Sequence, residues 1–201
     1  MAQLDIPTDV ELLFVQKPDV PGLAKIYDGY KEQLENFYKE YPDFLNSRPL
    51  EYEYLYHGTS QTITSRILKF GFDPHQGERT SSNYGRGCYF ARYLSMSLDD
   101  QYSTPAIGSG YKYVFVAKVL VGATLAGNSS LHYPLPYLTS NNGENMDEQF
   151  NSAVDSLSDP SIFATFHINQ AYPRYLLVLR LVQFFLRCVI HVVHFVQYEL
   201  I

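Results

Sequence analysis

Three segments of this chain carry the residue types best suited to chemistry: YLYHGTS (54–60), NYGRGCYFA (83–91) and SIFATFHINQAYPRYLLVL (161–179). Taken one at a time, each has an ordinary structural explanation. A histidine at the end of a strand is usually a satisfied polar group, and a Gly-x-Gly before an aromatic strand is usually a bulge. The functional argument therefore rests on their order and spacing along one chain.

The elements that must position these segments follow from the spacing of apolar residues and from helix-breaking residues. From Pro21, apolar and aromatic side chains recur at spacings of three and four, which predicts a helix that ends at Pro42. The segment EYEYLYHG (51–58) predicts a strand. After it, Ser60 is suited to cap a short helix that stops at Gly71.

Further strands are expected in the second half of the chain. The segment 87–91 and the β-branched, aromatic segment 111–122 both predict strands, the second long and largely buried. A loop-rich stretch, 127–160, follows, and the turn NQAYPR separates two more apolar runs, 162–168 and 175–179. Early helices followed by many strands predict an α+β domain.

Composition limits the classes of protein to which the chain can belong. Its 201 residues suffice for one domain with a core and are too few for two domains of ordinary size. With 46% hydrophobic and 18% charged residues, the chain is expected to fold. Its 15 Lys and Arg against 21 Asp and Glu give a net charge of −6, which argues against bulk nucleic-acid binding.

Cysteine usage and the N-terminus both favour an intracellular location, cytoplasmic or nuclear. The two cysteines, Cys88 and Cys188, make no disulfide framework and cannot by themselves hold a zinc ion. A reducing compartment is therefore expected. The first residues include acidic side chains and lack a basic segment followed by an apolar run, so no signal peptide is predicted.

The segment 181–201 is an apolar extension with a regular polar pattern. Spacings of three and four place five polar side chains on one stripe of an expected helix: Arg180, Gln183, Arg187, His191 and His194. Two arginines near a bilayer centre would each cost about 2.5 kcal/mol or more, so a membrane span is marginal. A packed tail or oligomer contact, a membrane-surface or partner helix, and a non-native terminus all stay open.

Taken together, the three segments resemble the catalytic domain of the poly(ADP-ribose) polymerase-like, diphtheria-toxin-type ADP-ribosyltransferases. The resemblance runs from about Leu55 to Leu179 and includes HGT, GRGCYFA, a serine eight residues after Tyr89, the KVLVG strand and QAYPRYL. It implies the ADP-ribosyltransferase fold, an α+β domain whose core is a split antiparallel sheet flanked by short helices. It also implies NAD as a consumed co-substrate, and no metal.

The resemblance divides the chain into three parts: a divergent N-terminal helical part (1–50), the transferase catalytic core (51–180) and the apolar extension (181–201). The first part lacks the Leu-Trp motif associated with the mono-transferring branch, because the chain has no Trp. Met96 stands where some relatives carry an aromatic residue near nicotinamide.

The resemblance assigns hydrogen-bonding roles toward NAD to three residues. His57 would bond a hydroxyl of the adenine-side ribose. Gly58 would present its backbone amide and carbonyl to the nicotinamide carboxamide, where a side chain would obstruct the approach. Ser97 would add its hydroxyl to the same carboxamide.

Aromatic rings supply other contacts that the resemblance implies. Tyr89 and Tyr102 would sandwich the nicotinamide ring, each contact contributing about 0.5–1.5 kcal/mol beyond area burial. Their faces also attract the positive charge of that ring. Thr59 and the loop residue Arg79 are further candidates for the ribose and pyrophosphate.

Catalysis in this family breaks the bond between nicotinamide and ribose through an oxocarbenium-like transition state. Polymerising members use a glutamate near the start of a late strand for elongation, and aligning QAYPRYL places Ile162 there. Isoleucine offers neither an acceptor nor a base. The catalytic set His57, Tyr89 and Ile162 therefore predicts transfer of one ADP-ribose to a protein side chain, on another protein or on the chain itself.

Two other functions stay open at the level of sequence. A catalytically silent domain could keep the NAD pocket as a binding or scaffold module, although silent relatives tend to lose the histidine. A transferase directed at nucleic acid is disfavoured by the net charge of −6, yet it would need only a local basic patch.

The loop 127–150 lies where family members shape access for the acceptor.

Overall fold

The computed structural model describes residues 6–45, 48–75, 83–132, 136–138 and 145–182. Within these ranges the helices are α1 (Pro21–Glu40), α2 (Gln61–Phe70), α3 (Leu94–Ser97) and the 3-10 helix η1 (Pro42–Leu45). The strands are β1 (Val10–Gln16), β2 (Glu51–Thr59), β3 (Cys88–Ala91), β4 (Tyr111–Leu120), β5 (Thr124–Ala126), β6 (Pro136–Leu138), β7 (Asn145–Gln149), β8 (Ser152–Val154), β9 (Ile162–Thr165) and β10 (Ala171–Leu181).

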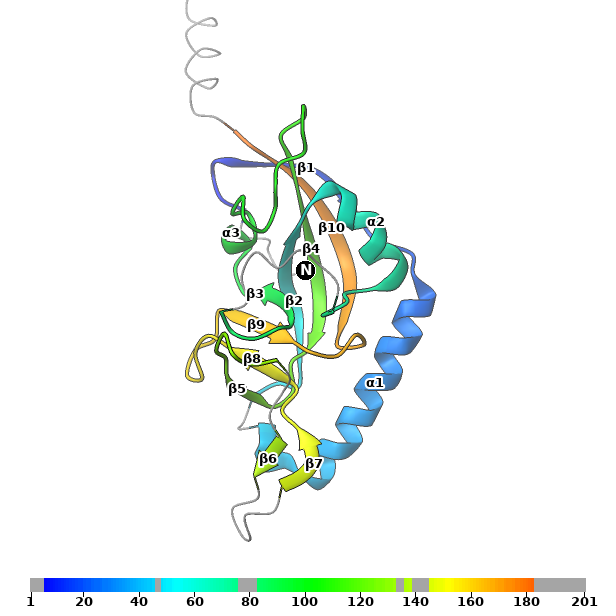
Figure 1. Ribbon diagram of the computed structural model, residues 1–201. Helices are drawn as coiled ribbons and strands as arrows, with labels where there is room; N and C mark the ends of the chain where they lie inside the picture. Colours follow the sequence, from blue (N-terminus) through cyan, green and yellow to red (C-terminus); the bar gives the residue numbers. More distant parts are fainter. Residues whose placement is uncertain (1–5, 46–47, 76–82, 133–135, 139–144, 183–201) are drawn as a thin grey trace, which may run out of the picture.

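The main sheet has eight strands in the order β1-β10-β4-β2-β3-β9-β8-β5, and β6 pairs with β7 in a separate two-stranded sheet. Neighbouring strands are antiparallel, except that β5 and β8 are parallel. Only the pair Tyr56 and Ala91 joins β2 to β3. Beyond that pair the sheet divides into an inner half, β1-β10-β4-β2, and an outer half, β3-β9-β8-β5, whose strands cross the direction of the inner ones (Figure 1).

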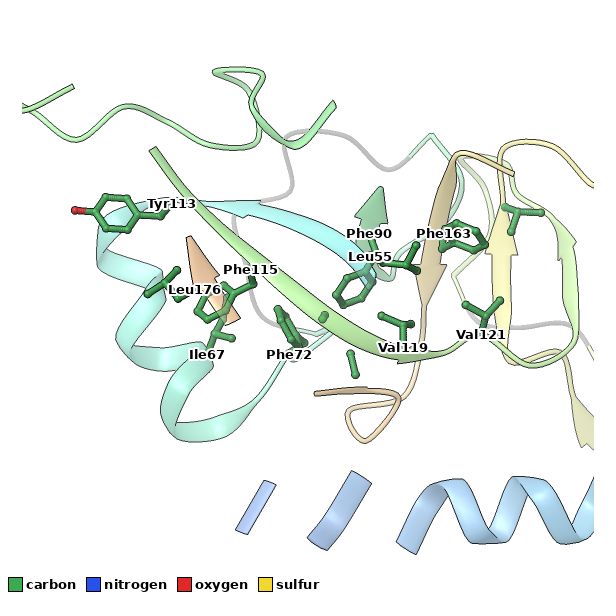
Figure 2. Close-up of a cluster of buried hydrophobic side chains, with 13 residues drawn as sticks. Leu55, Ile67, Phe72, Phe90, Tyr113, Phe115, Val119, Val121, Phe163 and Leu176 are labelled. Atoms are coloured by element: carbon green, nitrogen blue, oxygen red, sulfur yellow. The ribbon is translucent and has the colours of Figure 1, made fainter. Parts of the chain in front are cut away.

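Strand β4 lies at the centre of the core because both of its faces are covered. On one face, Phe115 and Val119 join an aromatic-rich cluster that includes Phe72, Phe90 and Phe163 (Figure 2). On the other face, alternate residues of β4 pack with side chains from α3 and β10. A strand buried on both faces accounts for the nearly continuous apolar sequence of 111–122, so the predicted long buried strand is confirmed.

The predicted helices form where the spacing placed them. Pro21 occupies the first turn of α1, and the helix ends just before Pro42. Helix α2 ends at Gly71, whose φ of 78° suits glycine and whose N–H donates to the Ile67 carbonyl. The prediction that Ser60 caps α2 was wrong in its detail: the Ser60 hydroxyl lies 3.0 Å from the Thr62 hydroxyl and makes no cap hydrogen bond.

The acidic pair at the start of β2 attaches α1 to the sheet. The Tyr27 hydroxyl donates to Glu51 Oε1 at 2.6 Å, and Lys31 and Lys118 form ion pairs with the same carboxylate. Burial alone would raise the pKa of Glu51, but the hydrogen bonds from Lys31, Tyr27 and Lys118 lower it. The Glu51-x-Glu53 pair is therefore part of an ionic cluster that supports the fold.

Three features differ from the sequence-based expectation. A strand, β1, precedes the first helix and pairs with β10, within the segment expected to be helical. The stretch 127–160, expected to be loops, contains three short strands, β6 to β8. The turn near NQAYPR ends earlier than expected, because β10 already begins at Ala171. Pro173 stands beside a register shift in the β10–β4 ladder, between Pro173 and Tyr175, and such irregular points of a sheet tolerate proline.

The apolar extension can be described only at its start. Leu181 is the last residue of β10, and residues 183–201 lie outside the described part of the chain, together with the helix expected there. Among the helices that the structure does describe, none has both the length and the apolar character needed to cross a bilayer.

Gln170, the first residue of the QAYPRYL motif, is a buried amide that ties three strands together. Its Oε1 accepts from the backbone N–H groups of Phe166 and His167 at 2.9 and 2.7 Å. Its Nε2 donates to the carbonyls of Leu120 and Asn151 at 2.9 and 3.0 Å. The amide thus fixes the β9–β10 turn against the ends of β4 and β8.

We expect Gln170→Ala to lower the free energy of unfolding by about 2–4 kcal/mol, because it leaves several buried backbone groups without partners. Urea unfolding followed by circular dichroism measures this change. The control is Gln33→Ala on the exposed side of α1, which should change stability by no more than about 0.5 kcal/mol. Equal effects of the two substitutions would contradict the structural role of Gln170.

Candidate active site

A cavity opens at the place where the two halves of the sheet separate. About 510 Å³ of empty space lies within it, part of which is open to solvent. Six of the residues singled out by sequence line it: His57, Gly58, Tyr89, Ser97, Tyr102 and Ile162. They come from β2, β3, α3, the segment after α3, and β9, so the split in the sheet brings both halves of the fold to one site.

His57 is held in a defined orientation at the split. Its Nδ1 lies 2.8 Å from the carbonyl oxygen of Tyr89, an atom that can only accept a hydrogen bond. Nδ1 must therefore carry the proton, and in the neutral ring Nε2 is an acceptor. Burial lowers the pKa of His57, while the hydrogen bond to Tyr89 acts in the opposite direction. The neutral ring is thus suited to accept a hydrogen bond from a hydroxyl group of a ligand.

Tyr89 is fixed by its hydroxyl as well as by its strand. The hydroxyl donates to the Gly85 carbonyl at 2.7 Å and accepts from the backbone N–H of Tyr84 at 3.0 Å. These two bonds close the segment before β3 against the tyrosine itself. The Tyr89 ring therefore enters the cavity wall with little freedom to rotate, as a stacking surface requires.

Gly58 is a glycine because the backbone of α3 lies directly against it. A Cβ at this position would lie 2.3 Å from the Ser97 carbonyl oxygen and 3.2 Å from the Tyr102 carbonyl carbon. This close approach places the backbone of Ser97 and of Tyr102 beside the end of β2, and both residues line the cavity. Ser97 is buried, whereas Tyr102 keeps 39% of its surface exposed and forms the open rim of the cavity.

Ile162 stands at the start of β9, opposite Ala91 of β3. Its backbone N–H, together with those of Ser156 and Ser161, donates to one carboxylate oxygen of Asp155 at 2.9–3.0 Å. The acidic side chain of this turn is thus engaged with the backbone, while the side chain that faces the cavity is aliphatic.

Two other predicted residues are not part of the cavity lining. Thr59 is buried at the end of β2 and pairs with Tyr113 of β4. Arg79 lies outside the described residues. The predicted role of Thr59 at the ribose is without structural support, and that of Arg79 stays a prediction.

Six further residues line the cavity: Tyr56, Asn83, Tyr84, Phe90, Ala91 and Met96. The sequence comparison had placed Met96 near the nicotinamide position, but it gave the others no role. Asn83 and Tyr84 begin the NYGRGCYFA segment, and their place in that segment is the sequence feature that could have identified them. The backbone of Gly127 lies directly against Tyr84, since a Cβ at position 127 would lie 2.5 Å from the Tyr84 Cβ.

The site offers no activated thiol. The Cys88 Sγ lies 3.9 Å from His57 Nδ1, but burial, together with the nearby charge of Asp73, raises the pKa of Cys88 to about 12. Cys88 is therefore a neutral thiol at physiological pH. Within the described residues, no group of three or more His, Cys, Asp or Glu side chains is placed to hold a metal ion.

This arrangement agrees with a match along most of the sequence. Residues 5–181 match the family described as the poly(ADP-ribose) polymerase catalytic domain. The chain belongs to this family. Its split antiparallel sheet with a few helices is the α+β ADP-ribosyltransferase fold, as the sequence predicted. ADP-ribosyltransferases use NAD as a co-substrate.

Several relatives of this catalytic domain carry names that state an activity. The chain is 36% identical over 168 residues to mouse protein mono-ADP-ribosyltransferase PARP10, a match that covers 84% of the chain and 16% of that protein. It is 30% identical over 166 residues to human protein mono-ADP-ribosyltransferase PARP14, covering 83% of the chain and 8% of that protein. For mouse protein mono-ADP-ribosyltransferase PARP12 the identity is 31% over 156 residues, with 78% and 20% covered. The chain thus spans a fifth or less of the length of these relatives.

We expect Gly58→Ala to destabilise this catalytic domain by about 1–3 kcal/mol, because the added methyl group collides with the backbone of α3. Thermal unfolding measures the effect. Gly29→Ala is the matched control: no atom lies within 4 Å of a Cβ at this exposed position of α1, so stability should stay the same or rise. A stable Gly58→Ala variant would show that α3 is not packed against β2 as described.

We expect the pKa of His57 to lie below its ordinary value of 6.5 in the folded protein. As the pH falls below 6.5, the unfolded chain then binds the proton first, so the free energy of unfolding decreases until the folded-state pKa is reached. Urea unfolding at a series of pH values measures this decrease. Burial also lowers the pKa of His167, so the decisive comparison is with His57→Gln, which should remove part of the decrease. An unchanged pH dependence in His57→Gln would count against the assigned burial of the ring.

Proposed function

We propose that this chain transfers a single ADP-ribose unit from NAD to a protein side chain and releases nicotinamide. The observation that carries the proposal is the convergence of six predicted residues on one cavity at the split of the sheet. These residues come from separate segments of the sequence, and all of them except Ile162 supply a group suited to NAD recognition. The names of the related proteins support the same activity.

The residues of the cavity suit the two ends of NAD. His57 would accept a hydrogen bond from an adenine-side ribose hydroxyl through Nε2, since Nδ1 is already bonded to Tyr89. The backbones of Gly58 and Ser97 lie directly against each other, and the Gly58 backbone and the Ser97 hydroxyl would bond the carboxamide of nicotinamide. The rings of Tyr89 and Tyr102 would lie against the nicotinamide ring and stabilise its positive charge.

The aliphatic side chain of Ile162 supports single transfer over chain elongation. Elongation requires an acceptor for a ribose hydroxyl and a base for the incoming ribose, and isoleucine supplies neither. The nearby Asp155 does not replace them, since one of its carboxylate oxygens accepts from three backbone N–H groups. The loss of one preorganised group of this kind lowers a rate by about 10²–10³. An acceptor carboxylate or another protein nucleophile would then supply the missing assistance.

Proteins are the proposed acceptors, including the chain itself. No large excess of positive charge favours a nucleic acid, because the net charge is −6. A binding module without turnover is the alternative that the experiment must separate. It would share the NAD contacts and differ only in the absence of transfer.

Incubation of the purified chain with NAD and a protein extract, followed by intact-mass analysis, tests the proposal. We expect mass increments of one ADP-ribose unit on the chain or on acceptor proteins. His57→Ala should lower the rate by about 10²-fold or more, because it removes the acceptor at Nε2 and the bond across the split. The control is His132→Ala, an exposed histidine outside the cavity lining, which should keep its activity.

Two other outcomes would contradict the proposal in different ways. Long polymers made by the unmodified chain would overturn single transfer. Calorimetric binding of NAD without any transfer would instead support the binding module.

A further inference from the structure

A buried lysine, Lys112 of β4, has no role in the chemistry described above. None of its surface is exposed, yet its side chain ends in an ammonium group. The ammonium donates to the Leu98 carbonyl at 2.6 Å and to the Ser103 carbonyl at 3.0 Å, and it forms an ion pair with Asp100. Its three N–H groups therefore have three oxygen partners, all within the segment 98–103.

The two carbonyls that Lys112 binds belong to residues next to the cavity lining. Leu98 directly follows Ser97, and Ser103 directly follows Tyr102. Lys112 thus holds the chain immediately after each of the two residues that form one wall of the cavity. The segment between them is a tight turn, in which the N–H groups of Tyr102 and Ser103 both donate to the Asp99 carbonyl.

A second contact joins the same segment to the same strand. The hydroxyl of Ser103, which is fully buried, donates to the Tyr113 carbonyl at 3.2 Å and accepts from the Tyr113 N–H at 3.1 Å. Strand β4 also fixes the opposite wall, because Val114 pairs with Gly58 and Phe115 pairs with His57. Consecutive positions of β4 therefore set the distance between the two walls.

The cost of burying Lys112 argues that this position matters. Taking an ammonium group out of water is expensive, and an apolar residue of similar size would pack at lower cost. Asp100 offsets little of that cost by charge attraction, because 74% of its side chain is exposed and water screens the pair. The ammonium makes directed hydrogen bonds to the two carbonyls, and an apolar residue would make none.

We propose that Lys112 is a positioning residue that holds Ser97 and Tyr102 in place for NAD. The inference rests on the proposed function, since NAD is the ligand that these two residues would contact. Lys112 acts on them through the backbone of Leu98 and Ser103 and has no contact with the ligand. Its loss would leave the residues of the site present but the wall loosely held.

Lys112→Met removes the ammonium group and keeps the length of the side chain. We expect the Kd and KM for NAD to rise about tenfold, close to the loss of one ring contact, with a smaller change in kcat. The matched control is Lys118→Met on the same strand. Lys118 forms ion pairs with Glu51 and Glu53 outside the cavity lining, so NAD binding should be unchanged.

A double-mutant cycle distinguishes positioning from general destabilisation. If Lys112 acts through the Tyr102 wall, Lys112→Met should weaken NAD binding much less in a Tyr102→Ala background than in the unmodified chain. Additive effects on binding would overturn the proposal. Normal NAD binding by the Lys112→Met variant would also overturn it, provided that the unmodified chain binds NAD. If the unmodified chain itself fails to bind NAD, the proposed function fails instead.

Hydrogen exchange tests the attachment without NAD. The Leu98 amide is hydrogen-bonded to Ser95 at the end of α3, and the amides of Tyr102 and Ser103 are hydrogen-bonded within the turn. Exchange of these three amides should accelerate in Lys112→Met but not in Lys118→Met. If Lys112→Met does not fold, Asp100→Ala provides the second variant, because it removes one exposed partner of the ammonium and should accelerate the same amides to a smaller extent. Unchanged exchange in the folded variants would overturn the proposal.

Discussion

The site depends on a single hydrogen bond across a gap in the main sheet, from His57 Nδ1 to the Tyr89 carbonyl. The β2–β3 ladder consists of one residue pair, Tyr56 and Ala91, so the two strands diverge immediately after it. That divergence creates the cavity, and the His57 bond limits how far the strands separate. The same bond assigns the ring proton to Nδ1 and leaves Nε2 as an acceptor. One hydrogen bond therefore fixes both the separation of β2 from β3 and the nitrogen of His57 that carries the proton.

Around this bond, three polar side chains serve the backbone. Gln170 satisfies the β9–β10 turn, Asp155 binds three amides before β9, and Lys112 binds two carbonyls after α3. Gln170 and Asp155 lie where the chain leaves regular structure, and Lys112 reaches from β4 to such a segment, so each supplies partners that backbone groups would otherwise lack. The residues facing the cavity are thus held by a second set of residues whose bonds are directed away from the ligand.

The sequence predicted the elements whose signals are local. The helix from Pro21, its end before Pro42 and the turn at Gly71 follow from spacing and breaker residues, and 111–122 is apolar enough to be a buried strand by itself. Strand β1 could not be found in this way, because it is defined by pairing with the distant β10. The short strands of 127–160 also lack a periodic signal. Six cavity residues were found by the order of their motifs, whereas Thr59, the last residue of the HGT motif, is not among the lining residues.

The single pair between the half-sheets also bears on how such a domain diversifies. The half-sheets share one backbone pair, yet Val154 and Phe163 of the outer half pack into the same buried cluster as β4. A substitution at a buried position of the outer half is therefore felt at β4, whereas a substitution on its exposed surface is not. A lineage built on this frame can thus vary the surface of its outer half without rebuilding the strands that line the cavity.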